Sequence, residues 1–256
     1  MKALNTAIIL AAGTGTRVGA NIPKQFIEVM GKPILAWTLE IYQNNPAIDA
    51  IELVCHPDWV EQSRAIVEQY GITKLKWLTL GGSTFQESTM NGVFNLRGVL
   101  DEDDIVVLTF GVSPMTTNEV IQDSIRVAQL YGNGIASEDM VLCTCLKDPD
   151  DTTGEGSSVQ PILRETIRGF SEPWSFRFGE LCEAYETGLA RGMLDELEPH
   201  TTSLYMALGK RVYFSRGTHN ICKITYKQDL DTFEGWLLLK QKRAAEAGCH
   251  RQEEAQ

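Results

Sequence analysis

The sequence predicts an α/β fold in which a mostly parallel central sheet is flanked by helices. Three observations support this prediction. The apolar run Ala7–Leu10 has no polar interruption, which is typical of a strand buried on both faces. The glycine-rich segment Ala11–Gly19 follows it directly, as such turns do at the carboxyl end of the first strand in open α/β sheets. Apolar runs then alternate with segments of helical spacing along the rest of the chain.

The first half of the chain is expected to alternate helices with strands. A helix is predicted from Pro33, which suits a first turn, to Asn44. A second helix is expected to end at Gly71, as a C-cap glycine would make it do. The predicted segments are strand Ile48–Cys55, helix Pro57–Tyr70, strand Trp77–Leu80 and strand Asp104–Leu108.

The second half continues the alternation but contains one long polar interruption. The segment Asn118–Tyr131 has clean amphipathic spacing and predicts a helix that ends at Gly132–Gly134. Lys147–Ser158 is polar, acidic and glycine-rich, which predicts a loop. The other predicted segments are strand Met140–Leu146, helix Gly179–Gly192, strand Arg211–Gly217 and a closing helix over 228–246.

Length and charge limit the classes of protein that the chain can represent. The 256 residues suit one α/β domain, predicted over 1–246 and followed by a frayed tail over 247–256. A net charge of −11 argues against a nucleic-acid binder, and no apolar run is long enough to span a membrane. No signal peptide is recognised at the start, and a cytoplasmic protein is therefore expected. The six scattered cysteines are expected to be buried, reduced thiols rather than metal ligands.

The glycine-rich segment after the first strand has the properties of a polyanion site. Its three glycines, Gly13, Gly15 and Gly19, allow backbone N–H groups to approach phosphate oxygens closely. Arg17 and Lys24 add two cations nearby. The segment is not a dinucleotide fingerprint, because Val18 stands where the third glycine should be, and it lacks the closing Gly-Lys-Ser/Thr of a P-loop.

Three motifs together resemble a known family. The segment Ala11–Gly19, the sequence Pro23-Lys24-Gln25-Phe26 and the segment Gly31–Leu35 look like the cytidylyltransferases that make CDP-sugar alcohols, which act on ribitol 5-phosphate or methylerythritol phosphate. The resemblance extends over nearly the whole chain. It implies a Rossmann-like nucleotidyltransferase fold with a protruding arm, here at about 137–162, which would reach into a second subunit of a homodimer.

The resemblance also implies site residues and substrates. Arg17, Lys24 and Lys223 would be catalytic, holding the phosphates of CTP, and Mg²⁺ would bind mainly through those phosphates. Arg164 and Thr225 would contact a small phosphorylated acceptor. Two loops would bind the nucleotide, and the second would recognise the cytosine. The nucleotide-binding set is Ala11, Ala12, Gly13, Thr14, Gly15 and Thr16 in the first loop, and Gly81, Gly82, Ser83 and Ser88 in the second.

The sequence departs from the family pattern on the acceptor side. Phe110 and Ser113 stand where the family has an aspartate and an arginine, and Glu172-Pro173-Trp174 also departs from the pattern. In the second nucleotide loop, Phe85 stands where the family has an arginine. Phenylalanine supplies neither a cation nor a hydrogen-bond acceptor. The expected function is transfer of CMP from CTP to a phosphorylated sugar alcohol, with either a changed acceptor or a poor one. The alternatives left open are a catalytically impaired homologue that acts as a regulator or partner, and a nucleotide binder without transferase activity.

Overall fold

A seven-stranded sheet with one reversed strand forms the centre of the molecule. The structure is a computed structural model that describes residues 3–13, 22–219 and 223–253, without the side chains of 247–253. The strand order is β11-β7-β10-β6-β1-β4-β5. All adjacent pairs are parallel except those of β10, which runs antiparallel to β6 and to β7. The strands are β1 (Asn5–Ala11), β4 (Ala50–Cys55), β5 (Leu75–Leu80), β6 (Ile105–Phe110), β7 (Asn133–Asp139), β10 (Arg168–Arg177) and β11 (Phe214–Arg216).

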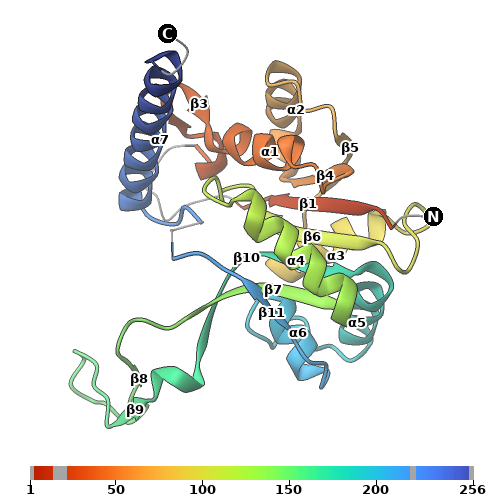
Figure 1. Cartoon of the computed structure of the whole chain (residues 1–256). Helices are drawn as coiled ribbons and strands as arrows, with labels where there is room; N and C mark the ends of the chain where they lie inside the picture. Colours follow the sequence, from red (N-terminus) through yellow and green to blue (C-terminus); the bar gives the residue numbers. More distant parts are fainter. Residues whose placement is uncertain (1–2, 14–21, 220–222, 254–256) are drawn as a thin grey trace.

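Helices cover both faces of this sheet, as predicted (Figure 1). The apolar run of β1 explains why: Ile8 belongs to one hydrophobic cluster and Ile9 to the other, because successive side chains of a strand point to opposite faces. The predicted fold class, a mostly parallel α/β sheet, is therefore confirmed. The helices are α1 (Ile34–Asn44), α2 (Val60–Gln69), α3 (Phe85–Asn95), α4 (Asn118–Tyr131), α5 (Phe178–Ala190), α6 (Thr201–Ala207) and α7 (Lys227–Glu253).

The predicted strand Met140–Leu146 is confirmed only over its last three residues, β8 (Thr144–Leu146), and β7 was not predicted. We predicted a strand over Met140–Leu146 and treated Gly132–Gly134 as the end of a helix. Gly132 does cap α4 with a φ of 90°, but β7 begins at the next residue. A Cβ on Gly134 would collide with the backbone of α4 at Ser124, so this glycine is required by close helix–strand packing rather than by a turn.

An arm projects from the body between β7 and β10 (Figure 1). The chain leaves the sheet after Asp139 and rejoins it at Arg168, so the arm covers 140–167 and lies slightly later in the chain than the expected range of about 137–162. Within it, β8 (Thr144–Leu146) pairs antiparallel with β9 (Gln160–Ile162), and the polar loop lies between them. A 3-10 turn, η4 (Arg164–Thr166), follows. Cys143 and Cys145 are exposed free thiols here, so the expectation of buried cysteines was wrong for both.

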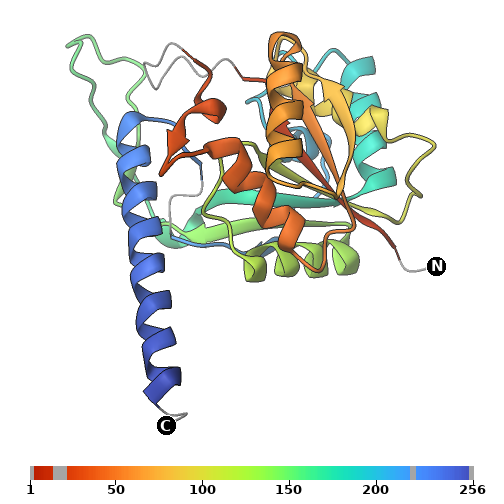
Figure 2. The same ribbon diagram turned by 90° about the horizontal axis from the view of Figure 1, so that it is seen from above.

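The closing helix α7 is longer than predicted. It continues to Glu253, past the expected end at 246, so the start of the predicted frayed tail is helical. Ala244, Ala245 and Ala247 favour helix at that point. Figure 2 shows that the far half of α7 stands clear of the sheet. No helix in the described part of the chain is both long and apolar enough to span a membrane.

Candidate active site

The first glycine-rich loop begins at the carboxyl end of β1. Its described part is Ala11–Gly13, which the buried side chain of Gln25 fixes by donating from Nε2 to the carbonyls of Ala11, at 2.8 Å, and Gly13, at 3.0 Å. Gln25 lies in the short 3-10 turn η2 (Lys24–Phe26). Its place beside a lysine in the second motif was the signal for this role, which the sequence interpretation missed. The predicted residues Thr14, Gly15, Thr16 and Arg17 lie outside the described residues.

The second glycine-rich loop joins β5 to α3 and packs directly on the first. A Cβ on Gly81 would collide with the Cβ of Ala12, so a glycine is needed where the loops meet. The hydroxyl of Ser88 accepts from the N–H of Gly82 at 3.0 Å, and the side chain of Thr84 caps α3 by accepting from the N–H of Glu87. The loop is therefore held by its own hydrogen bonds.

Glu87 fixes the turn of the second loop from the first turn of α3. Its carboxylate accepts from both the hydroxyl and the N–H of Ser83, each at 2.7 Å. These hydrogen bonds lower the pKa of Glu87. A carboxylate in the first turn also suits the positive end of the helix.

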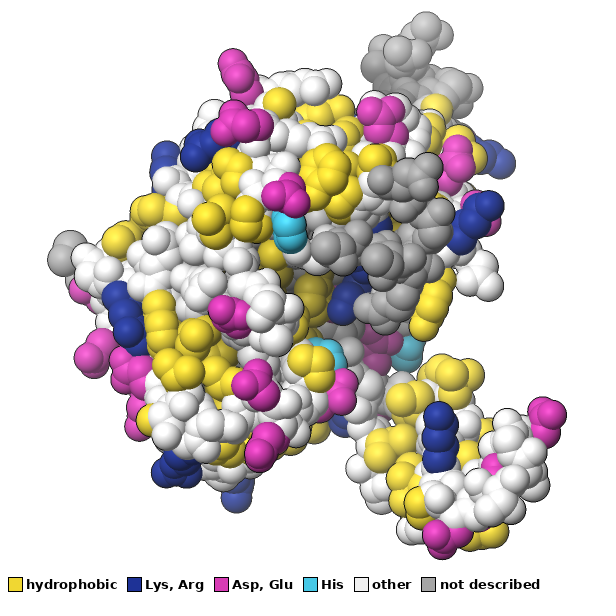
Figure 3. All heavy atoms as spheres, turned by 180° about the vertical axis from the view of Figure 1, so that it is seen from behind, with side chains coloured by type: hydrophobic (Ala, Val, Ile, Leu, Met, Phe, Trp, Pro, Cys, Tyr) yellow, Lys and Arg dark blue, Asp and Glu magenta, His cyan; other side chains and the backbone are white. Residues whose placement is uncertain are grey.

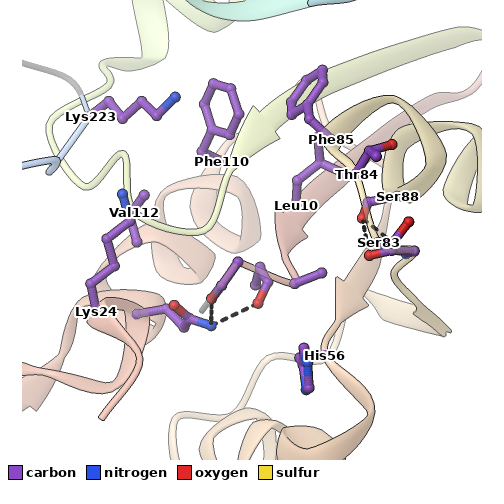
Figure 4. A pocket seen from close by; sticks show the side chains of 15 residues that line it. Leu10, Lys24, His56, Ser83, Thr84, Phe85, Ser88, Phe110, Val112 and Lys223 are labelled. Carbon is purple, nitrogen blue, oxygen red and sulfur yellow. Dashed lines mark hydrogen bonds between the residues drawn. The ribbon is translucent and has the colours of Figure 1, made fainter. Parts of the chain in front are cut away.

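Two lysines from distant parts of the chain meet opposite these loops. Lys24 extends from η2, and its Nζ donates to the carbonyl of Ile224 at 2.8 Å, which ties it to the segment that carries Lys223. The N–H of Ile224 donates to the carbonyl of Val112 at 2.8 Å. Figure 4 shows both lysine side chains at the same side of the pocket, with Lys223 directed toward Phe110.

Loops and lysines line a single pocket of about 450 Å³, within the usual range for small-molecule sites. Six residues, which we call the glycine wall, supply small side chains and backbone. Opposite them lie the two lysines and Phe110. The glycine wall is Ala11, Ala12, Gly13, Gly82, Ser83 and Ser88.

Four rings form a cluster beside the pocket, and two of them, Phe85 and Phe110, line it. Phe85, Phe110, Trp174 and His200, which we call the aromatic cluster, contact one another with ring centroids 5.6–6.3 Å apart. The two positions where the family pattern leads us to expect an arginine and an aspartate are thus occupied by two rings in contact. Lys223 places its Nζ 3.7 Å from the centroid of the Phe110 ring, a cation–π geometry.

His200 lies at the start of α6, and its surroundings do not support a catalytic role. Burial lowers its pKa, and the nearby ammonium of Lys223 lowers it further, so the imidazole is neutral at pH 7. It occupies the N-cap position of α6 without a capping hydrogen bond from its side chain.

The predicted acceptor residues do not line this pocket. Arg164 lies on the arm, where its guanidinium donates to the carbonyl of Val141 at 2.9 Å. The N–H of Thr225 donates to the carboxylate of Asp229 at 2.7 Å, at the start of α7. Arg168, an arginine close to Arg164 in the sequence, is paired with Asp139 at 2.6 Å. An acceptor role for Arg164 and Thr225 remains a prediction.

A buried carboxyl group, missed as a site residue in the sequence, lies behind the aromatic cluster. Glu172 lies on β10, where the register with β7 shifts between Phe170 and Trp174, and is only 6% exposed. It accepts a hydrogen bond from the Ser113 hydroxyl at 3.2 Å. Burial raises its pKa, while the charges of Lys223 and Lys24 act in the opposite direction.

Comparison with known proteins gives one consistent result. The profile of the 2-C-methyl-D-erythritol 4-phosphate cytidylyltransferase family matches residues 5–238. The chain is 35% identical over 238 residues to a ribitol-5-phosphate cytidylyltransferase of Lacticaseibacillus paracasei, covering 92% of this chain and 99% of the relative. It is 34% identical over 235 residues to a 2-C-methyl-D-erythritol 4-phosphate cytidylyltransferase of Geotalea uraniireducens, covering 91% and 96%.

Solved structures agree on the fold. The structure of 4-diphosphocytidyl-2C-methyl-D-erythritol synthase from Anaerococcus prevotii superposes with a TM-score of 0.76 at 23% identity, over 92% of this chain and 96% of that one. The 2-C-methyl-D-erythritol 4-phosphate cytidylyltransferase of Francisella tularensis gives a TM-score of 0.74, also at 23% identity, over 91% and 99%.

Proposed function

The chain belongs to the 2-C-methyl-D-erythritol 4-phosphate cytidylyltransferase family, and from that premise we propose that it transfers CMP from CTP to a phosphorylated sugar alcohol of the ribitol 5-phosphate kind. In this reaction an oxygen of the acceptor phosphate forms a bond to the α-phosphorus of CTP. The bond from that phosphorus to the bridging oxygen breaks, and pyrophosphate leaves with the electron pair.

One observation carries the proposal: the meeting of Lys24 and Lys223 across a pocket from two glycine-rich loops. Phosphoryl-type transfer needs alignment and charge neutralisation more than covalent help from the protein. Lys24, together with Arg17, would neutralise the leaving pyrophosphate. Lys223 would lie at the α-phosphate, where negative charge grows in the transition state. The glycine wall would hold the nucleotide, with cytosine at the second glycine-rich loop and the adjoining Ser88.

Magnesium enters this proposal only with the nucleotide. In the described ranges no three His, Cys, Asp or Glu side chains come together as a metal site, so those residues offer no protein cage for the ion. When bound, Mg²⁺ would bridge phosphate oxygens and retain several waters, as this hard cation usually does.

The arm supports a second part of the proposal, that the enzyme works as a homodimer. Figure 3 shows apolar side chains gathered on the projecting arm, and Val159 is 87% exposed and Leu163 74% exposed there. A partner subunit would cover these side chains and would receive Arg164 near its own acceptor. Sedimentation of the wild type and of Leu163→Asp tests this, with a monomeric wild type as the contradicting result. Because CTP is an intracellular substrate, we also propose a cytoplasmic location.

The central test is pyrophosphate release with CTP and Mg²⁺ against a panel of polyol phosphates and phosphonates, with CTP binding followed by calorimetry. We expect release with one acceptor and at least about a 100-fold loss in Lys24→Ala, since removing one charge-stabilising group from a transition state typically costs that much. Lys242→Ala, an exposed lysine on α7, is the control.

Two other outcomes would change the assignment. Tight CTP binding without release of pyrophosphate on any acceptor would favour the catalytically impaired homologue. This alternative is considered because Phe85 and Phe110 replace an arginine and an aspartate of the family pattern. Absence of CTP binding would contradict both functions.

A further inference from the structure

The environment of Glu172 is unusual for a carboxyl group. Burial of a carboxylate is costly unless cations or hydrogen-bond donors compensate for the lost water. Trp174, two residues along the strand, is itself buried and packs on Phe110 with ring centroids 5.8 Å apart. The carboxyl group of Glu172 is thus kept behind the rings, close to the pocket but not among the residues that line it.

Ser113 connects Glu172 to the loop that follows β6. Its side chain is fully buried and donates to Oε2 of Glu172 at 3.2 Å. The residue before it, Val112, accepts through its carbonyl from the N–H of Ile224. Ile224 follows Lys223 directly. The carboxyl group and the lysine are therefore attached to the two sides of one short loop.

The side chain of Lys223 also has a contact that fixes its position, with Phe110. Its ammonium lies over the ring of Phe110, which ends β6, the strand that pairs with β10. Burial raises the pKa of Glu172, and in the described part of the chain the positive charges of Lys223 and, more weakly, Lys24 oppose this shift. Lys24 approaches from η2 through its hydrogen bond to Ile224. Contacts from β6, from β10 and from the segment before α7 thus bring Glu172 and Lys223 into one neighbourhood.

We propose that Glu172 is a positioning residue for Lys223: its carboxylate, oriented by Ser113, holds the lysine ammonium at the edge of the pocket against Phe110. The effect on turnover rests on the proposed function, whereas the charge pairing does not. Positioning matters here because the ammonium of Lys223 would have to meet charge that develops on the α-phosphate.

This inference gives a physical account of the departures at Phe110 and Ser113. A carboxylate is absent from the end of β6, but one returns to the same neighbourhood from β10. Ser113 carries no positive charge, and its hydroxyl donates a hydrogen bond to that carboxyl group instead. The acceptor side has kept a buried carboxyl group and has changed the strand that supplies it.

The charge pairing can be tested without activity. Protein labelled with ¹³C at glutamate carboxyl groups is titrated by NMR, and the Glu172 signal is assigned by its absence in Glu172→Gln. We expect Lys223→Met to move the titration of Glu172 to higher pH, because a neighbouring cation that favours the carboxylate is lost. Lys223→Arg should restore the wild-type titration and Lys242→Met should leave it unchanged. His200 responds to Lys223 as well, so its imidazole is followed in the same samples.

The effect on catalysis is tested by steady-state kinetics with the acceptor that supports release. We expect Glu172→Gln to lower kcat about 10- to 100-fold, the usual cost of a misplaced catalytic group, with the KM for CTP within about twofold of wild type. Glu172→Asp should recover part of kcat. Glu40→Gln removes a carboxylate from another lysine pair, with Lys32 at 2.7 Å, outside the pocket, and serves as the matched control.

The outcomes separate this inference from the proposed function. If Lys223→Met does not shift the Glu172 titration, or if Glu172→Gln leaves kcat unchanged in an active enzyme, the positioning role is wrong. If the wild type releases no pyrophosphate with any acceptor while the titration still responds to Lys223, the proposed function fails and the charge pair stands.

Discussion

Glu52 and Glu172 are both buried carboxyl groups, but they have different partners. Glu52 on β4 accepts hydrogen bonds from the neutral side chains of Thr79 and Asn95, and its other oxygen has no partner among the described residues. Behind the aromatic cluster, Glu172 has a serine and two lysines around it. The first carboxyl joins α3 to the sheet, whereas the second lies among charges. Similar burial therefore serves packing in one place and electrostatics in the other.

The glycine wall and the aromatic cluster also differ in the kind of surface that they present. The glycine wall presents backbone and small side chains, so its function depends on how closely chain segments approach each other. The aromatic cluster presents large rings, so its contribution is packing. Substitutions in the two regions should therefore have different signatures: loss of nucleotide affinity on the glycine wall, and loss of stability in the cluster.

The largest effect on folding is expected from Phe110→Ala. Phe110 is 9% exposed and contacts two rings, so its removal should lower the free energy of unfolding by about 3 kcal/mol, the low end for a buried phenylalanine. CTP affinity should change less than about threefold, since the nucleotide is expected on the opposite wall. Urea denaturation and calorimetry measure the two quantities, with the more exposed Phe170→Ala as the control. A loss of CTP affinity that equals the loss of stability would erase the contrast.

The next effect concerns pH and Glu52. Burial raises the pKa of Glu52 from 4.5 to about 7. Because this folded-state pKa lies above the unfolded one, the stabilisation is fully present below pH 4.5 and is lost as pH rises through 7. The shift corresponds to about 3 kcal/mol.

Glu52→Gln keeps the shape of the side chain and removes its titration. We expect urea denaturation of this variant to show a smaller loss of stability than wild type between pH 5 and pH 8, by up to about 3 kcal/mol. Glu172, whose pKa is also raised, remains in both proteins and cancels in the difference. Equal pH dependence in the two proteins would mean that Glu52 does not carry this linkage.

The smallest effect is expected from Gly81→Ala. The added Cβ collides with Ala12 at the contact between the two loops, and such overpacking typically costs about 1–3 kcal/mol. We expect the loops to separate and CTP affinity to fall about tenfold, as calorimetry would show. Gly235→Ala on α7, where an added Cβ meets nothing within 4 Å, is the matched control and should be slightly stabilising. Unchanged CTP affinity in Gly81→Ala would show that the contact between the loops is dispensable.

The glycine wall could be predicted from the sequence because local spacing determines it. Ala12 and Gly13 follow a strand directly, and the hydroxyl of Ser88 accepts from the N–H of Gly82, six residues earlier. Each of these features involves residues that are near one another in the chain. The pairing of Lys24 with the Lys223 segment was expected only from the family pattern, since nothing local links residues so distant.

The aromatic cluster could not be predicted in the same way. It depends on β10 running antiparallel to β6, a topology that no local pattern in β10 indicates. No strand was therefore predicted over Ser171–Phe176, and the burial of Glu172 went unnoticed. The failure to predict β7 had a related cause, because Gly134 serves packing against α4 rather than a turn.

The hydrogen bond from Lys24 to Ile224 joins parts of the chain 200 residues apart, and this separation has a consequence during translation. The strand β1, both glycine-rich loops and Lys24 leave the ribosome early. Lys223 and its neighbours leave it last but for α7. At roughly 5–20 residues per second, the nascent chain spends at least about seven seconds with one half of its pocket made. The two lysines can meet only when synthesis is nearly complete, so a chain cut short before residue 223 lacks the second one.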